Sequence, residues 1–259
     1  MRFSLKGYVG PRRVLSLLAI LATGCSAGTG AREADTAGAP SQSTGTAAAG
    51  ATSPAAGSAI SGTAGATGAL KRVVILGTSL TAGLGLDPAN AYPTLLQRKA
   101  DSAGFRLDIV NAGLSGETSA GALRRAAWVL DQPAALIVLE VGANDGLRGV
   151  DPDSTYANLV ALVGEIRKAQ PNARMRLVQM EAPTNLGRDY TTRFHAAYER
   201  AARDARIPLL PFLLDGVAGV PRLNQADGIH PNIEGSKIVA QTMWSAMRAT
   251  LDSLSTAAQ

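Results

Sequence analysis

Short apolar runs alternate with stretches of helical periodicity from Ala69 onward. Within the runs the apolar residues are consecutive rather than alternating with polar ones, which is typical of parallel strands that are buried on both faces. The strands predicted in this way are Arg72–Leu76, Leu107–Asn111, Ala135–Val141, Arg176–Met180 and Ile207–Phe212.

The stretches between and after these runs predict helices. In one of them, apolar side chains recur at steps of three and four residues from Tyr156 to Ile166, which places them along one helix face. The predicted helices are Tyr92–Ala103, Thr118–Leu130, Asp153–Ala169, Tyr190–Arg203 and Asn232–Leu251. Regular alternation of strands and helices predicts one α/β domain over residues 69–255, with a parallel five-stranded sheet between two layers of helices.

The first 24 residues differ from the rest of the chain. Four basic residues and no acidic residue precede or flank the apolar run from Val14 to Ala22, which is the arrangement of a secretory signal. The run is much shorter than the roughly 20 residues that span a bilayer as a helix. Residues 1–24 are therefore predicted to be a lipoprotein-type signal peptide, because "LATGC" resembles the lipobox in which the cysteine becomes the lipidated first residue.

Residues 25–68 consist almost entirely of alanine, glycine, serine, threonine and proline, and Ile60 is the one large aliphatic residue among them. Such a composition buries too little apolar surface to offset the entropy of ordering the chain, so this segment is predicted to be a tether. Cys25 is the single cysteine of the chain and has no partner for a disulfide, which leaves lipidation as its expected use. The protein is therefore expected to be exported, to the periplasm or the cell surface, and to be held on a membrane by this lipid.

The formal net charge of +5 comes mainly from the four basic residues of the predicted leader, and without them the charge is near +1. No basic run remains that would favour a nucleic-acid partner.

Polar sequences follow the predicted strands: "GTSL", "NAGLSGET", "GANDG" and "DGIHPN". Since the carboxyl ends of parallel strands meet at one edge of a sheet, these sequences are expected to converge. Ser79 enters a glycine-rich turn there and is the candidate nucleophile. A serine hydroxyl needs a neighbouring base, for which histidine is the usual side chain.

His230 is the better of the two histidines as a base, because His195 lies within a helical stretch where a surface role is more common. Asp227 precedes His230 by three residues, so its carboxylate can reach the imidazole Nδ1 and leave Nε2 for Ser79. The alternative is that Asp227 simply forms an Asx turn before the last helix. Pro231 is expected in the first turn of that helix.

Attack on an acyl carbonyl also requires hydrogen-bond donors for the developing oxyanion. Gly116 can supply a backbone N–H and Asn144 a side-chain amide, although each residue type is also common in turns.

Other catalytic templates do not fit the sequence. Thr81 stands where the G-x-S-x-G elbow requires glycine, and no phosphate-binding glycine loop follows the first strand. With two histidines and no cysteine in the predicted domain, no metal site and no cofactor are expected.

The ordered motifs "GTSLTAG", "NAGLSGETSAGALRR", "GANDGLRG" and "DGIHPN" resemble those of the SGNH (GDSL) hydrolase superfamily, over roughly Val73 to Met247. Within it, the chain is similar to the bacterial arylesterase, acyl-CoA thioesterase I and lysophospholipase group. The resemblance implies a flavodoxin-like fold, a triad of Ser79, Asp227 and His230, and an oxyanion hole formed by Ser79, Gly116 and Asn144. The chain departs from the family at Thr78, where the family name implies aspartate, so the turn and its supporting hydrogen bonds are expected to differ.

These features predict a serine esterase that hydrolyses carboxylic esters with aryl groups or short to medium acyl chains, with lysophospholipids and thioesters as further candidates. The loops that contain Leu147 and Pro183 are expected to line the substrate pocket. Two alternatives stay open. An O-deacetylase of carbohydrate or envelope polymers would use the same triad, although an aromatic content of 4% argues against a sugar-stacking surface. A non-catalytic tethered binding module would keep the cleft without turnover.

Overall fold

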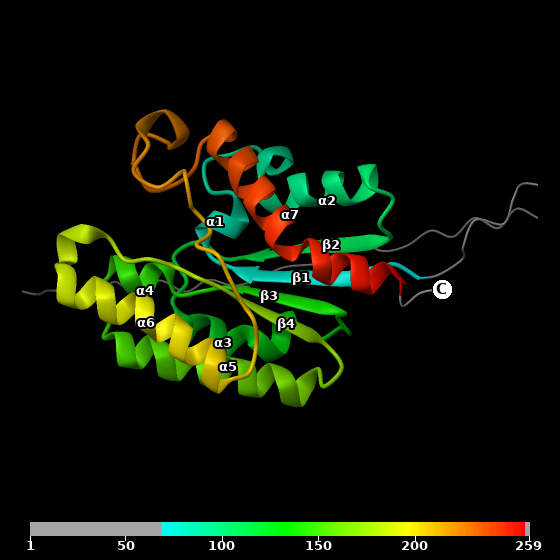
Figure 1. The fold of residues 1–259 in the computed structure, drawn as a ribbon, viewed down its shortest axis with the longest axis horizontal. Helices are drawn as coiled ribbons and strands as arrows, with labels where there is room; N and C mark the ends of the chain where they lie inside the picture. Colours follow the sequence, from blue (N-terminus) through cyan, green and yellow to red (C-terminus); the bar gives the residue numbers. More distant parts are fainter. Residues whose placement is uncertain (1–68, 257–259) are drawn as a thin grey trace, which may run out of the picture. The chain divides into compact units, whose positions relative to one another are not determined.

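The computed structural model describes residues 69–256, which form a parallel sheet between two layers of helices (Figure 1). The strands are β1 Lys71–Gly77, β2 Leu107–Gly113, β3 Leu136–Glu140, β4 Arg174–Val178 and β5 Leu209–Leu210. They pair in the order β2-β1-β3-β4-β5, and every pair is parallel. This is the strand order of flavodoxin-like folds, so the predicted α/β fold class is confirmed.

The helices cover both faces of the sheet. They are α1 Ser79–Ala82, α2 Tyr92–Ser102, α3 Ser119–Val129, α4 Ala143–Leu147, α5 Pro152–Ala169, α6 Arg188–Asp204 and α7 Ile233–Thr256, with short 3-10 turns η1 Pro88–Asn90, η2 Thr184–Leu186 and η3 Pro221–Leu223. Helices α2 and α7 pack together on one face, and α3, α5 and α6 pack on the other (Figure 1). The central strands β1 and β3 are consequently the most deeply buried.

Strand order determines where a site can form. Chain connections leave β1 toward one face and β3 toward the other, so a crevice opens beyond the carboxyl ends of these two neighbouring strands. Ser79 follows β1 and Asn144 follows β3, which brings both residues to this crevice.

The bounds of all five predicted strands differ from the observed ones by one or two residues at one or both ends, and the differences are largest at β4 and β5. β4 covers Arg174–Val178 rather than Arg176–Met180, and β5 covers Leu209–Leu210 rather than Ile207–Phe212. Proline lacks an N–H group and is confined to strand ends and sheet edges. Pro208 and Pro211 flank β5, which lies at the sheet edge, so the strand is limited to the two residues between them.

The last helix also differs from the prediction, since α7 begins at Ile233 and Pro231 lies outside it. The side chain of Asn232 caps the helix by accepting hydrogen bonds from the N–H groups of Glu234 (3.0 Å) and Gly235 (3.1 Å). Pro231 instead forms an antiparallel bridge with Asn224.

The predicted signal peptide (residues 1–24), tether (residues 25–68) and lipidation site (Cys25) lie outside the described residues and stay predictions. Between residues 69 and 256, no helix combines the length and the apolar character that a membrane span requires.

Candidate active site

Ser79 is the first residue of α1, a single helical turn that follows β1 directly. The turn predicted here from its glycines is therefore a short helix, which ends at Gly83 in the left-handed conformation (φ 74°). The first N–H groups of a helix have no partner within it, so the N–H of Ser79 is available to a ligand. The residue as a whole is 8% exposed.

Ser79, His230 and Asp227 form one chain of hydrogen bonds. The His230 Nε2 atom lies 2.8 Å from Ser79 Oγ, and His230 Nδ1 lies 2.7 Å from Asp227 Oδ2. Because a carboxylate only accepts hydrogen bonds, this contact places the imidazole proton on Nδ1 and leaves Nε2 to accept from the serine hydroxyl.

Asp227 also forms the turn that was weighed as the alternative to this contact. Its Oδ1 accepts hydrogen bonds from the N–H groups of Ile229 and His230, both at 3.0 Å, while Oδ2 contacts the imidazole. The imidazole contact and then these backbone contacts lower the pKa of Asp227 to about 2. The carboxylate therefore stays ionised while it orients His230.

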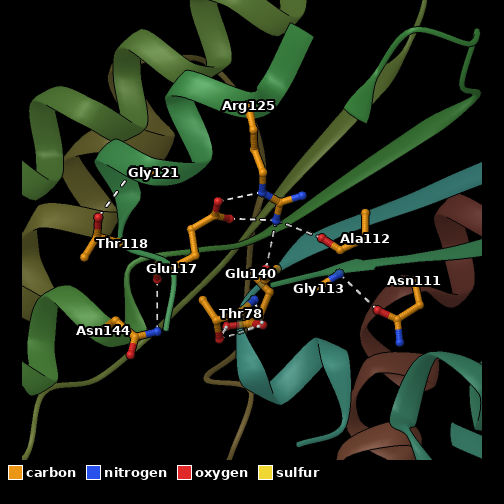
Figure 2. Close-up of polar contacts among 11 residues, drawn as sticks. Thr78, Asn111, Ala112, Gly113, Glu117, Thr118, Gly121, Arg125, Glu140 and Asn144 are labelled. Atoms are coloured by element: carbon orange, nitrogen blue, oxygen red, sulfur yellow. Dashed lines mark hydrogen bonds and ion pairs between the residues drawn. The ribbon is translucent and has the colours of Figure 1, made fainter. Parts of the chain in front are cut away.

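Asn144, the second residue of α4, lies at the same edge of the sheet and is 9% exposed. Its Nδ2 donates a hydrogen bond to the carbonyl oxygen of Glu117 at 3.0 Å, as Figure 2 shows. An amide nitrogen carries two hydrogens, so this contact orients the group and leaves a second donor.

Gly116 precedes Glu117 on the loop between β2 and α3. Its φ of +78° is in the left-handed region, which residues with a Cβ rarely adopt. Its carbonyl accepts a hydrogen bond from Arg148 Nη2 at 2.9 Å. The loop around Gly116 is thus attached to Asn144 through the adjacent carbonyl of Glu117.

A cavity of about 490 Å³ opens beside these groups, and Ser79, Asn144 and His230 contribute to its wall. Leu147 and Pro183, which were predicted to line the pocket, are also in the wall. Sequence reasoning missed most of the apolar lining, namely Leu80, Met180, Phe212, Leu214, Ala218 and Ile229. Leu80 and Ile229 adjoin Ser79 and His230 in the sequence, which is a signal that could have identified them.

Behind Ser79 lies a fully buried carboxylate, Glu140, at the end of β3. It accepts hydrogen bonds from the Thr78 N–H at 2.9 Å, the Thr78 hydroxyl at 3.0 Å and the Thr81 hydroxyl at 2.7 Å. Burial raises the pKa of Glu140 to about 7, against the lowering effect of these donors. A Cβ at Gly77 would lie 2.6 Å from this carboxylate, so the close approach requires glycine.

Thr78 therefore supports the carboxylate of Glu140 as an uncharged donor (Figure 2). Thr78 is the position at which the chain departs from the family motif. Its hydrogen bonds with Glu140 connect the start of α1 to the end of β3.

His195 lies apart from these groups, on α6. Its Nδ1 lies 2.6 Å from Glu181 Oε1, and this contact raises the pKa of His195. No hydrogen bond in the described part of the chain joins His195 to Ser79. No group of three or more histidine, cysteine, aspartate or glutamate residues between 69 and 256 has the arrangement of a metal site.

The chain matches the model of the GDSL-like lipase/acylhydrolase family over residues 75–238. It is 35% identical over 184 residues to the esterase TesA of Pseudomonas aeruginosa, which covers 71% of this chain and 90% of that relative. It is 38% identical over 176 residues to "Thioesterase 1/protease 1/lysophospholipase L1" of Escherichia coli, covering 68% of this chain and 82% of that one.

Among solved structures, the fold is similar to a crystal structure of the psychrotrophic esterase EstA from Pseudoalteromonas sp., inhibited by monoethylphosphonate. The TM-score is 0.67 and the sequence identity 34%, over 70% of this chain and 99% of that one.

Proposed function

Because the chain belongs to the GDSL-like lipase/acylhydrolase family, we propose that it is a serine esterase of carboxylic esters with Ser79, His230 and Asp227 as its triad. The observation that carries the proposal is the continuous chain of hydrogen bonds from Ser79 Oγ through His230 to Asp227. Names of the relatives support the reaction class, since they include an esterase and a thioesterase/lysophospholipase.

In the first step, Ser79 Oγ attacks the ester carbonyl carbon while its proton passes to His230 Nε2. The electron pair of the carbonyl moves to oxygen, where the N–H groups of Ser79 and Gly116 and the amide of Asn144 act as donors. As the carbonyl reforms, the alcohol oxygen leaves with the proton from Nε2, and the acyl group stays on Ser79.

In the second step, water attacks the acyl-enzyme and gives one proton to His230 Nε2. The intermediate then collapses, the proton returns to Ser79 Oγ, and the carboxylic acid is released. Asp227 stays ionised throughout and stabilises the positively charged imidazole, because its pKa lies at about 2.

The size and the lining of the cavity favour ester substrates with acyl or aryl groups of modest size. Its volume of about 490 Å³ is within the range of roughly 300–1,000 Å³ that small-molecule sites occupy. The apolar side chains of Leu80, Phe212 and Ile229 in its wall suit the hydrocarbon part of such an ester.

Turnover of p-nitrophenyl esters from acetate to dodecanoate by the purified full chain tests the proposal. We expect Ser79→Ala to abolish turnover, and a fluorophosphonate probe to label Ser79 in the wild type as read by peptide mass spectrometry. Ser154→Ala is the matched control, because Ser154 is exposed on α5 and should leave both readouts unchanged.

Each other result would count against the proposal in a specific way. Equal turnover by Ser79→Ala would exclude Ser79 as the nucleophile. A folded wild type that hydrolyses no ester of the series but releases acetate from acetylated polysaccharide would favour the deacetylase, and one that does neither would favour a binding module.

A further inference from the structure

A largely buried guanidinium lies behind the proposed oxyanion hole. Arg125, on α3, contacts both carboxylate oxygens of Glu117 through one edge of its guanidinium. Nε is 2.6 Å from Oε1, and Nη2 is 2.6 Å from Oε2 (Figure 2). The Arg125 and Glu117 side chains are 16% and 4% exposed. The pair is therefore bidentate and mostly shielded from water.

The same guanidinium also contacts the main chain at the ends of two strands. Arg125 Nη2 has two hydrogens, and one is used by Glu117. The other is shared between the carbonyl oxygen of Ala112, near the end of β2 (2.9 Å), and that of Gly77, at the end of β1 (3.2 Å). One side chain thus connects β1, β2 and the loop that precedes α3.

The three proposed oxyanion donors lie near the residues that Arg125 contacts. Two are close along the sequence, and the third is joined by a hydrogen bond. Ser79 is two residues beyond Gly77, and Gly116 is the residue before Glu117. Asn144 donates to the carbonyl oxygen of Glu117 itself. Through Gly77 and Glu117, Arg125 is therefore linked to the three separate segments that carry these donors.

We infer that Arg125 is a positioning residue that holds these three oxyanion donors in one geometry, an inference that rests on the proposed esterase function. Arg125 acts through Glu117 and the two carbonyls and is absent from the residues that line the cavity. Lysine would provide the charge but not the planar fork of donors that reaches Glu117 and both carbonyls together.

The burial of an ion pair is weak evidence that the pair serves stability. A buried ion pair often contributes no more to folding than apolar side chains of the same volume. Small displacements of catalytic donors, in contrast, can reduce a rate about 100-fold.

Esterase assays on the full chain test the inference. We expect Arg125→Met to lower kcat about 10- to 100-fold with KM within about 3-fold of wild type, because the donors act on the transition state. The inhibition constant of an alkyl boronic acid, which mimics the tetrahedral state on Ser79, should rise in proportion to the loss in kcat/KM. Arg125→Lys should restore part of kcat.

Two further variants separate positioning from other effects. Arg124→Met changes the exposed neighbour on the same helix and should leave every readout unchanged. Glu117→Gln with Arg125→Met removes the uncompensated carboxylate that the single change leaves buried. We expect kcat to stay low in this double variant, since the contacts with Gly77 and Ala112 are still lost.

Three outcomes would overturn the inference. They are an unchanged kcat and boronate constant in Arg125→Met, a lowered melting temperature as its one effect, or full recovery of kcat in the double variant. A wild type without Ser79-dependent turnover would instead refute the proposed function, so the two failures are distinguishable.

Discussion

Asp227 shows how one short side chain meets two requirements. Its two oxygens serve different partners, the backbone of the tight turn and the imidazole of His230. The two interpretations of "DGIHPN" weighed from the sequence are therefore compatible, because the turn brings the carboxylate to the imidazole. Replacing the carboxylate by an amide tests the contact with the imidazole separately from the contacts that form the turn.

Asp227→Asn should lower kcat on p-nitrophenyl esters by about 10³- to 10⁴-fold, because an amide NH₂ opposite Nδ1 favours the wrong imidazole tautomer. The melting temperature should change little, since the amide oxygen can still accept from the N–H groups of Ile229 and His230. Steady-state kinetics and thermal unfolding check this. A variant with full kcat would show that Asp227 does not orient the base.

Short elements and loops, rather than the long helices, hold the chemical groups of this site. Ser79 and Asn144 lie on helices of four and five residues, and Gly116 lies on the loop between β2 and α3. Such short helices have little stability of their own, so tertiary contacts must hold them in place. The contacts of Thr78 and Thr81 with Glu140 do this for α1.

Gly116→Ala tests the loop. A Cβ there would meet no atom closer than 3.7 Å, so the cost comes from the left-handed backbone (φ +78°) and should be about 1 kcal/mol of unfolding free energy. We also expect a loss of kcat, because the relaxed loop moves its N–H group away from the oxyanion.

Gly164→Ala is the matched control. Gly164 lies within α5, and a Cβ there would meet nothing within 4 Å. The change should stabilise the fold by about 0.5–1 kcal/mol and leave kcat unchanged. Urea unfolding and kinetics on both variants give the comparison; a stable Gly116→Ala with full activity would contradict the role of this loop.

Glu140 links the site to the stability of the whole fold. The unfolded chain loses this proton near the ordinary pKa of 4.5, whereas the folded protein keeps it up to about 7. The folded state therefore binds more protons than the unfolded state between these values, so the contribution of Glu140 to stability falls as the pH rises through this window and is constant above it.

Glu140→Gln removes this titration. We expect the free energy of unfolding of the wild type, relative to the variant, to fall by about 3 kcal/mol at most between pH 4.5 and pH 7. The depressed pKa of Asp227 acts in both proteins and cancels in the difference. Urea unfolding at several pH values from 4 to 8 measures it, and a difference independent of pH would show that folding does not raise the pKa of Glu140.

Local patterns sufficed to predict the fold class, the family and the residues that now lie together. Continuous apolar runs and helical periodicity predicted five parallel strands and their flanking helices, and the family resemblance is confirmed by the match over residues 75–238. Because polar residues directly after strands must meet at one edge of a parallel sheet, the sequence also placed Ser79, Asn144 and His230 at one site. Their catalytic roles stay predictions until they are tested.

The remaining features depend on contacts between distant segments. The buried environment of Glu140 requires β1 and β3 to be neighbours, and the reach of Arg125 to Gly77 and Ala112 requires β1 beside β2. The places of Phe212 and Leu214 in the cavity wall likewise depend on which element packs against which. Burial, charge regulation and cavity shape arise from this packing, because they are properties of neighbours in space, and periodicity along the chain specifies only which face each residue occupies.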